Sequence, residues 1–401
     1  MFPDIETQLK HLSRGVIDIF PRDEFVARLD AARRANRPLR VKLGIDPTRP
    51  DIHLGHGVPL NKLRHFQEMG HQAVLIIGDY TGMIGDPSGQ DTTRPQITHE
   101  QVLENARTYL AQVGKIIDLS RTEVVHNGDW FAKMSFLDVI RLAGHMTVAR
   151  MLERDDFRKR YTENQPISLH EFLYPLMQGY DSVMVRSDVE IGGNDQTFNL
   201  LVGRQLQKDA GQPPQAALTL PLLVGLDGAM KMSKSYGNYI GINEDPWTMY
   251  GKTMSIPDAL LRTYFDLTSD VPPEETERLL AGSPMEAKLA LAFALVRRYH
   301  GEPAAREASD RFDREVRKKE TPEAVPEVRV PPEALEDGRI WIARLVVLCG
   351  LAESTSQARL LVTQGAVSLD GEAVTDANLN VAPKAGALLK AGKRKFARLA
   401  L

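Results

Sequence analysis

The chain has 401 residues, of which 42% are hydrophobic and 26% charged, a composition typical of a folded protein with two or three domains. Its 50 Lys and Arg residues are balanced by 53 Asp and Glu residues, so any basic surface that binds nucleic acid has to be local. The single Cys349 excludes an intramolecular disulfide and a cysteine-based zinc site, and it favours a reducing compartment. Because neither a signal peptide nor a run of about 18 apolar residues is present, we expect a cytoplasmic protein.

The first half of the chain alternates between strand and helix patterns. Residues 41–45 and 73–78 are short β-rich runs, and between them Leu60, Leu63 and Phe66 have helical spacing. A strand, a helix and a strand within about 40 residues form one βαβ unit, which predicts an α/β fold with a doubly wound parallel sheet. We expect residues 120–190 to be a mostly helical insertion, with strand character returning at 182–191.

The second half changes character twice. Helical periodicity dominates from about residue 247 to residue 317, and prolines among glutamates then predict a linker over 321–338. The last 60 or so residues form a separate module. We therefore expect a catalytic domain with its insertion, a helical domain, the linker and a small C-terminal α+β domain, at residues 1–225, 226–320, 321–338 and 339–401.

The first candidate site is His53-Leu54-Gly55-His56, at the predicted start of a helix. Free backbone N–H groups and the helix dipole favour an anion there, and two imidazoles could clamp a phosphate. Gly55 would let a flat base approach the backbone closely. A surface turn, or half of a metal site, would show the same two histidines, although no cysteine or further clustered histidine supports a metal.

The second candidate site is Lys231-Met232-Ser233-Lys234-Ser235, within a loop rich in glycine and serine. Two lysines in such a loop are suited to negative charge that develops on a leaving pyrophosphate. A solvated surface loop would also carry this composition. The combination with the histidine pair is more specific than either motif by itself.

The C-terminal module has a basic end. Two helices are predicted, over 341–348 and from Ser354 onward, followed by a strand that leads into an Asp-Gly turn at Asp370. No acidic residue follows Asp376, which suits phosphate binding, although a solubilising tail is the alternative. The basic residues after it are Lys384, Lys390, Lys393, Arg394, Lys395 and Arg398.

The two candidate sites together resemble the signature motifs of class I aminoacyl-tRNA synthetases. This resemblance implies a Rossmann-like catalytic domain that joins an amino acid to ATP, releases pyrophosphate and passes the amino acid to the 3′ end of a tRNA. By the same resemblance, His53 and His56 stabilise the transition-state phosphate and Gly55 packs under the adenine. Lys231, Lys234 and Ser235 would contact ATP, the two lysines at its β- and γ-phosphates.

Three further stretches resemble the tyrosyl enzymes of this class. In residues 85–89, Gly-Asp-Pro-Ser-Gly, Asp86 matches the residue that holds the ammonium group of the substrate. Tyr174, Gln178 and Asp181 have the spacing i, i+4, i+7, which places them on one helical face and lets one pocket use all three. The resemblance assigns Tyr174 and Gln178 to the ammonium group and Asp181 to the phenol hydroxyl.

The third stretch, Gly192-Gly193-Asn194-Asp195-Gln196, resembles the loop that binds the adenylate. Gly193 and Asp195 would lie at the ribose, and Gln196 would contact the carboxylate of the amino acid. Asp46 and Thr48, at the end of the predicted first strand, would sit beside the adenylate.

The chain departs from the better-known tyrosyl pattern at Lys42. Many relatives have a tyrosine there, which makes a second contact with the phenol, and a long cationic side chain cannot make the same neutral contact. Phenol recognition is therefore expected to depend more heavily on Asp181. Lys42, Leu43 and Asp79 instead resemble a second bacterial subgroup.

The partners follow from the resemblance. The C-terminal module resembles the S-four-like RNA-binding module, and the residues expected at the RNA are Arg344, Arg359, Lys393, Arg394 and Lys395. We expect tyrosine, ATP with Mg²⁺, a tRNA and a second copy of the chain, paired through the insertion around residues 130–151. The alternatives are a tryptophanyl-tRNA synthetase, a non-catalytic RNA-binding relative and a small-molecule ligase that forms adenylates.

Overall fold

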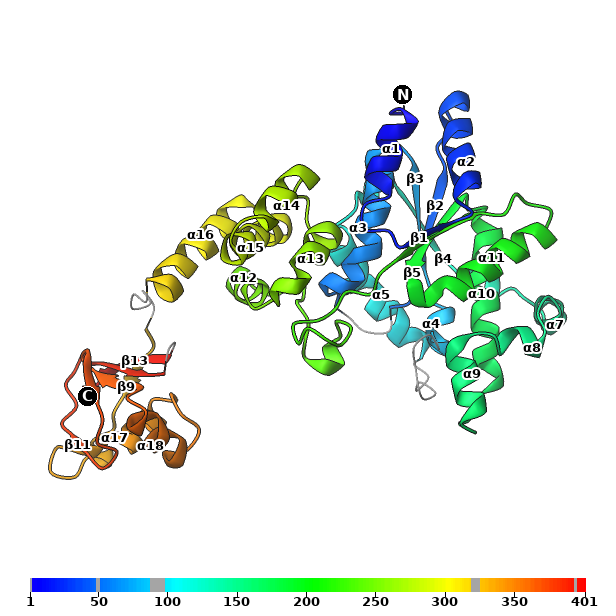
Figure 1. Cartoon of the computed structure of the whole chain (residues 1–401). Coiled ribbons are helices and arrows are strands. Elements are labelled where there is room, and N and C mark those ends of the chain that lie inside the picture. Colours follow the sequence, from blue (N-terminus) through cyan, green and yellow to red (C-terminus); the bar gives the residue numbers. More distant parts are fainter. Residues whose placement is uncertain (1, 48–50, 87–97, 319–324, 393–394) are drawn as a thin grey trace. The chain divides into compact units, whose positions relative to one another are not determined.

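The computed structural model describes two compact units, Met1–Ser309 and Asp310–Leu401 (Figure 1). The residues described are 2–47, 51–86, 98–318, 325–392 and 395–401. Within these ranges no helix is both long enough and apolar enough to cross a membrane.

The first unit is built on a six-stranded sheet with the strand order β1-β6-β5-β2-β3-β4. Strand β1 pairs antiparallel with β6, and the remaining neighbours are parallel, so the predicted doubly wound α/β fold is confirmed. The buried strands β2 and β3 pair in register from Arg40 with Gln72 to Ile45 with Ile77. The six strands are β1 (Asp18–Phe20), β2 (Arg40–Ile45), β3 (Gln72–Ile77), β4 (Thr122–His126), β5 (Val189–Gly193) and β6 (Ala216–Leu220).

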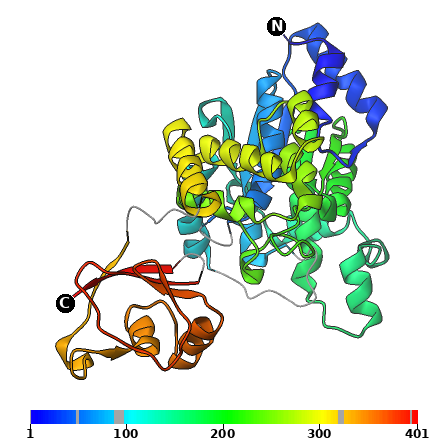
Figure 2. The same cartoon turned by 60° about the vertical axis from the view of Figure 1, so that its left-hand side comes forward.

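Helices surround this sheet, as Figures 1 and 2 show. Helix α3 buries Leu60, Leu63 and Phe66 as their spacing predicts, and Gly70 follows its end with a φ of 91°, which suits glycine. The helices before the insertion are α1 (Ile5–Leu12), α2 (Arg22–Ala35), α3 (Leu54–Glu68), α4 (Thr81–Ile84) and α5 (His99–Val113).

The predicted insertion is only partly helical. Residues Thr122–His126 form β4 at the edge of the parallel sheet, with its side chains half-buried, which is why the apolar signal of a core strand is weak there. The strand expected over 182–191 is shorter, because 182–185 complete α10. The helices here are α6 (Gly128–Phe131), α7 (Phe136–Ala143), α8 (Val148–Met151), α9 (Asp155–Thr162), α10 (Leu173–Val185) and α11 (Thr197–Asp209).

The helical segment after residue 245 belongs to the first unit as far as Ser309. Helix α13 packs against α3, and the Tyr264 hydroxyl donates to the Val224 carbonyl at 2.6 Å. This packing joins the helices to the sheet in one compact unit. They are α12 (Pro246–Met254), α13 (Leu261–Thr268), α14 (Pro273–Leu280), α15 (Pro284–His300) and α16 (Glu302–Phe312).

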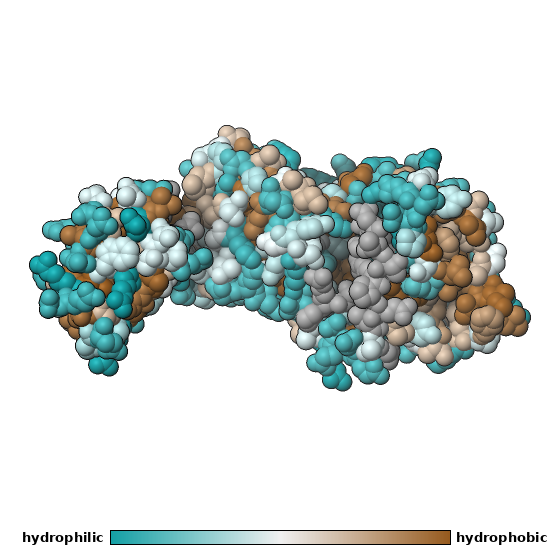
Figure 3. Space-filling view, turned by 90° about the horizontal axis from the view of Figure 1, so that it is seen from below, coloured by the Kyte–Doolittle hydropathy of each residue, from teal (hydrophilic) through white to brown (hydrophobic). Residues whose placement is uncertain are grey.

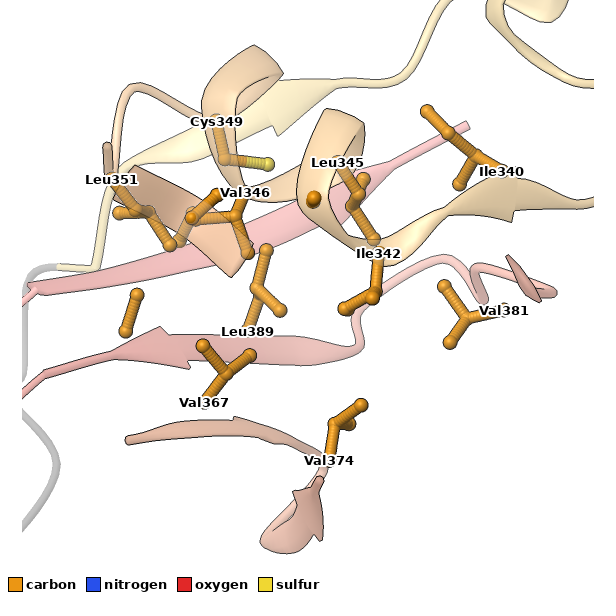
Figure 4. Close-up of a cluster of buried hydrophobic side chains, with 14 of the residues drawn as sticks. Ile340, Ile342, Leu345, Val346, Cys349, Leu351, Val367, Val374, Val381 and Leu389 are labelled. Carbon is orange, nitrogen blue, oxygen red and sulfur yellow. The ribbon is translucent and has the colours of Figure 1, made fainter. Parts of the chain in front are cut away.

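The second unit is an α+β module. Its five-stranded sheet has the order β10-β9-β12-β13-β7, and β11 pairs with β8. Buried aliphatic side chains from α17, α18 and the sheet form its core, some of which Figure 4 shows. The elements are β7 (Glu327–Arg329), β8 (Ile340–Trp341), α17 (Ile342–Leu348), α18 (Thr355–Thr363), β9 (Val367–Leu369), β10 (Glu372–Val374), β11 (Asn380–Val381), β12 (Leu388–Ala391) and β13 (Lys395–Ala400).

Part of the expected linker belongs to this module. Strand β7 lies inside 321–338 and pairs in parallel with β13, and Val330 and Ala334 are buried in the core. Because β7 is an edge strand, it needs only one hydrogen-bonded neighbour, which makes prolines on either side of it tolerable. Proline content therefore does not mark this segment as free of structure.

Candidate active site

A cavity of about 330 Å³ opens where β2, β3, β5 and β6 end. All four strands are parallel, so their carboxyl ends meet at one edge of the sheet, which is where open α/β sheets bind ligands. Most of the residues predicted to bind ATP and tyrosine meet here. Those that line the cavity are Asp46, Gly55, His56, Asp86, Tyr174, Gln178, Asp181, Gly193, Asp195 and Gln196.

Asp46, which follows β2, is held from two sides. The Tyr174 hydroxyl donates to its Oδ2 at 2.7 Å, and the Thr81 hydroxyl donates to its Oδ1 at 2.8 Å. The carboxylate lies directly over Gly78, where an added Cβ would come within 1.9 Å of Oδ1. Gly78 is thus required at the end of β3 for Asp46 to occupy this place.

Helix α10 presents Tyr174, Gln178 and Asp181 to the cavity, so the prediction from their spacing is confirmed. The Tyr174 side chain is 6% exposed, and burial, with Asp46 nearby, holds its pKa well above the usual value. Tyr174 therefore stays a neutral hydroxyl that donates to Asp46 and keeps oxygen lone pairs as acceptors.

Asp181 lies at the buried end of the cavity, where it is 4% exposed. The Trp130 indole donates to its Oδ1 at 3.0 Å, and the Asn127 amide donates to its Oδ2 at 3.3 Å. Burial raises the pKa of Asp181 to about 7, against the opposing influence of Lys42 and these two donors. The carboxyl group is thus held in place and sits near its titration point at neutral pH.

Asp79 supports the turn that carries these donors. It accepts from the Gly128 backbone N–H at 2.7 Å and lies 3.0 Å from the His126 ring nitrogen Nδ1. The Asn127 side-chain oxygen accepts from the Tyr80 backbone at 2.9 Å. The Asn127 amide group is thereby turned toward Asp181.

Lys42 is fully buried, and its ammonium group contacts protein acceptors. Its Nζ lies 2.8 Å from each of Glu190 Oε1, the Ser182 hydroxyl and the Gln178 backbone carbonyl. An ammonium group has three N–H donors, and these three acceptors account for all of them. Lys42 thus binds two groups of α10, the Gln178 carbonyl and the Ser182 hydroxyl, and does not line the cavity.

The opposite side of the cavity is formed by Asp86 and the 192–196 loop. Gln196 Nε2 donates to Asp86 Oδ2 at 2.7 Å, and Arg154 Nη2 lies 3.6 Å from the other carboxylate oxygen. Burial and the nearby Asp86 raise the pKa of Asp195, while Lys231 opposes the shift. An added Cβ at Gly193 would come within 2.4 Å of the Asp195 carboxylate, so this backbone has to be glycine for the close approach.

The two histidines are stacked at the start of α3. Their ring centroids are 3.7 Å apart with 21° between the ring planes, and the His53 backbone N–H donates to His56 Nδ1 at 3.4 Å. Gly55 lies beneath them, since an added Cβ would meet the His53 ring at 3.0 Å. His56 lines the cavity, and His53 lies behind it.

The 231–235 loop lies next to this helix start. An added Cβ at Gly55 would be 3.6 Å from the Met232 Cβ, which places the loop beside the histidines. Lys234 forms an ion pair with Asp51 at 2.5 Å, and Ser233 caps the short turn that contains Lys234 and Ser235. Neither Lys231 nor Lys234 lines the cavity.

Three of the predicted residues, Thr48, Lys393 and Arg394, lie outside the described residues. In the second unit, Arg344 on α17 and Arg359 on α18 are exposed, and these two helices pack together. Lys395 is also exposed, and its Nζ donates to the Leu351 carbonyl, between the two helices, at 3.1 Å. The three described basic residues thus lie on or beside the helix pair.

Sequence reasoning missed several side chains that shape the site. Trp130 and Asn127 contact Asp181, and Arg154 and Asn199 lie beside Asp86 and Gln178. A signal existed for Asn199, which lies three residues after Gln196 and hence on the same side of a helical turn. No local signal marked Arg154 as part of the site, because Asp86 and Asn199, its partners there, are distant in the sequence.

Comparison with known families covers both units. The family of class I tRNA synthetases for W and Y matches residues 34–316, and the SYY-like C-terminal domain of tyrosine–tRNA ligases matches residues 320–399.

Similar proteins are found over the full length. The tyrosine–tRNA ligase of Moorella thermoacetica is 52% identical over 99% of this chain and 96% of its own length. That of Haemophilus ducreyi is 50% identical over 100% of this chain and 99% of its own length.

Solved structures agree on the fold. The tyrosyl-tRNA synthetase of Archaeoglobus fulgidus, solved in complex with L-tyrosine, superposes with a TM-score of 0.59 at 23% identity, over 76% of this chain and 100% of that one. The truncated mitochondrial enzyme of Aspergillus nidulans gives a TM-score of 0.63 at 23% identity, over 76% of this chain and 92% of that one.

Proposed function

The chain belongs to the tyrosine–tRNA ligases of the class I tRNA synthetases, and from this premise we propose which residues perform each step. Members of this family are ATP-dependent ligases that attach tyrosine to tRNA. Tyrosine is first activated with ATP, which releases pyrophosphate, and is then passed to the 3′ end of the tRNA. Since this reaction supplies translation, we place the protein in the cytoplasm.

Tyrosine occupies the cavity with its phenol against Asp181. The Asp181 carboxylate accepts the phenol O–H, and Trp130 and Asn127 hold the carboxylate while it does so. Trp130 and Asn127 would still donate to the carboxylate with phenylalanine bound, but the buried lone pair that faces the phenol would lose its donor, at a cost of about 1–3 kcal/mol. Discrimination between tyrosine and phenylalanine by tyrosyl-tRNA synthetases is a well-known example of this effect, and the residues named here are what this chain contributes to it.

The ammonium group of tyrosine binds at the other end of α10. Asp86 supplies the negative charge, and Tyr174 and Gln178 supply neutral acceptors. Gln196 lies 2.7 Å from Asp86, so an amide that holds Asp86 can also reach the carboxylate of the same amino acid. Tyrosine is thus oriented at three points before ATP reacts.

ATP lies over the start of α3. Gly55 lets the adenine approach the backbone. His56 faces the cavity and would donate to the α-phosphate where charge develops, and His53, stacked behind it, is proposed to reach the same phosphate when ATP is bound. Asp195 and Gly193 hold the ribose, and Asp46 lies beside the adenylate. Thr48, which is outside the described residues, remains predicted for the same place.

Lys231, Lys234 and Ser235 contact the β- and γ-phosphates. The observation that supports this role is the ion pair of Lys234 with Asp51, since a lysine that already holds one oxyanion beside α3 is placed to exchange it for a phosphate. These residues need not form covalent bonds with the substrate, because positioning and electrostatic stabilisation dominate phosphoryl transfer.

Mg²⁺ enters with ATP, where it neutralises charge on the triphosphate. Three metal-ligating side chains come together in the described residues only at His11, His65 and Glu68, which do not line the cavity. Mg²⁺ would be held mainly by phosphate oxygens and water, and Asp195 is the carboxylate we propose to add a ligand from the protein.

The second unit binds tRNA through the basic residues of its helix pair. Arg344 and Arg359 are exposed on these helices and Lys395 is exposed beside them, at the start of β13, and their charges suit the phosphate backbone. Lys393 and Arg394 remain predicted for the same surface.

We further propose a homodimer formed through α7 and α8. Four large apolar side chains are exposed there, and Figure 3 shows a hydrophobic area at that end of the first unit, at right. A hollow of about 560 Å³ lined partly by Trp130, Met134 and Leu142 lies beside it. The exposed residues are Phe136 at 80%, Leu137 at 54%, Ile140 at 52% and Val148 at 63%.

The test of the activation step is amino-acid-dependent exchange of pyrophosphate into ATP, without tRNA. Exchange with tyrosine, and none with tryptophan or phenylalanine, is the expected result. Exchange with tryptophan would overturn the pocket assignment at Asp181. If no amino acid supports exchange, the chain is an RNA-binding member of the family without catalytic activity.

A further inference from the structure

Three side-chain amides form a connected chain that we call the amide relay: Gln178 and Gln196, which line the cavity, and Asn199, which joins them and does not line it. Asn199 is 1% exposed, and its Nδ2 donates to Gln178 Oε1 at 2.9 Å and to Gln196 Oε1 at 3.0 Å. One buried amide from α11 thus contacts both glutamines that the proposed function places at the tyrosine.

Each end of the amide relay terminates at a carboxylate. Gln178 Nε2 donates to Glu190 at 3.2 Å, and Gln196 Nε2 donates to Asp86 at 2.7 Å. An ionised carboxylate can only accept hydrogen bonds, so both glutamines have to turn their NH₂ groups toward it. Their carbonyl oxygens consequently both face Asn199.

The middle of the amide relay is fixed by a group that can only donate. Arg154 Nη1 donates to Asn199 Oδ1 at 3.2 Å. If the Asn199 amide were reversed, its NH₂ group would face the Arg154 donor and its oxygen would face the two glutamine oxygens. Arg154 is itself 5% exposed, forms an ion pair with Asp156 at 2.8 Å and lies over the Phe157 ring at 5.0 Å. The orientation of Asn199 is therefore imposed by a rigidly held cation.

Lys42 holds the Glu190 end in the same way. Its Nζ lies 2.8 Å from Glu190 Oε1, and both side chains are at most 1% exposed. Ser182 donates to the other Glu190 oxygen at 3.0 Å. These two contacts hold the Glu190 side chain in place, with Oε1 directed toward Gln178.

We propose that Arg154 and Asn199 are positioning residues for tyrosine, an inference that rests on the proposed function. Through Asn199 they fix the Gln178 amide so that its oxygen can accept from the ammonium group. They also fix the Gln196 amide so that its second N–H can donate to the substrate carboxylate. With either glutamine reversed, an oxygen would face Glu190 or Asp86, and the group offered to tyrosine would have the wrong polarity.

Asn199→Asp is the sharpest perturbation, because it keeps the shape of the side chain and its contact with Arg154 but removes both donors. The two glutamine oxygens then face carboxylate oxygen, and the amide relay loses its single arrangement. We expect the KM for tyrosine to rise roughly 10- to 100-fold in pyrophosphate exchange, the range for a lost or mispaired buried hydrogen bond. The KM for ATP should stay within about twofold.

Asn61→Asp is the matched control. Asn61 is also buried, donates to a backbone carbonyl, Leu267, at 2.8 Å and accepts from an arginine, Arg298, but it does not line the cavity. The same chemical change there should affect thermal stability and leave the KM for tyrosine unchanged. If both variants raise that KM equally, the effect is a general loss of packing and the proposal is wrong.

A second pair of variants at Arg154 keeps the proposal testable should Asn199→Asp fail to fold. Arg154→Lys retains a group that can only donate, whereas Arg154→Met retains bulk and cannot donate. We expect the KM for tyrosine to rise at least about fivefold more in Arg154→Met than in Arg154→Lys. Equal effects would overturn the orienting role. Absence of tyrosine-dependent exchange in the unmodified protein is a separate result, which would reject the proposed function itself.

Discussion

Replacement of Asp181 by asparagine should make the protein more stable at high pH while weakening tyrosine recognition. Burial raises the pKa of Asp181 from 3.8 to about 7, so the folded chain holds the proton more tightly than the unfolded chain does. A raised carboxyl pKa means that stability is lost as pH rises, from the unfolded pKa through the folded one. The asparagine side chain has no proton to lose over this range, so the variant escapes that loss.

The magnitude follows from the size of the shift. A pKa raised from 3.8 to about 7 corresponds to roughly 4 kcal/mol once the group is fully ionised, of which roughly 2 to 3 kcal/mol develops between about pH 5 and about pH 8. The free energy of unfolding of Asp181→Asn, minus that of the unmodified protein, should rise by this amount over the interval. For a unit of about 300 residues this is about 4 °C in Tm.

The assay is thermal unfolding of both proteins at a series of pH values, followed by circular dichroism. Asp118→Asn is the control, because hydrogen bonding from Ser120 lowers the pKa of the exposed Asp118, which stays ionised throughout. Its difference from the unmodified protein should not change with pH. A difference for Asp181→Asn that is equally flat would refute the argument that burial places this carboxyl group near its titration point.

Three further predictions test other parts of the site. Lys234→Ala should slow pyrophosphate exchange by roughly 100-fold, because the lysine acts on charge that develops in the transition state. Tyrosine binding, measured by equilibrium dialysis, should stay nearly unchanged, and equal losses in exchange and binding would contradict that role. Gly78→Ala should lower kcat/KM at least about tenfold, because the new Cβ would displace Asp46. Gly251→Ala is the control and should leave exchange unchanged, because nothing lies within 4 Å of the added carbon. A fully active Gly78→Ala would show that Asp46 need not occupy its place. Phe136→Glu should convert a dimer to monomers in analytical ultracentrifugation, and a dimer that persists at micromolar concentration would move the interface elsewhere.

Some of this site could be predicted from the sequence because its elements are local. The spacing of Tyr174, Gln178 and Asp181 defines one helical face without any knowledge of the fold, and His53 and His56 lie within one turn. The parallel sheet follows from one βαβ unit, and parallel strands bring their ends to one edge. These inferences need only the periodicity of the backbone.

The sequence by itself therefore determined the family, the order of the elements and ten of the residues that line the cavity, among them the acidic and amide side chains proposed to contact tyrosine. It left undetermined what each of these residues contacts, because a side chain finds distant partners only when the chain is packed. Lys42 meets Glu190 across neighbouring strands, and Arg154, just before α9, reaches Asn199 on α11. Only the tertiary structure could decide these pairings, since the direction of a buried amide or carboxylate depends on whether the group opposite can donate or accept.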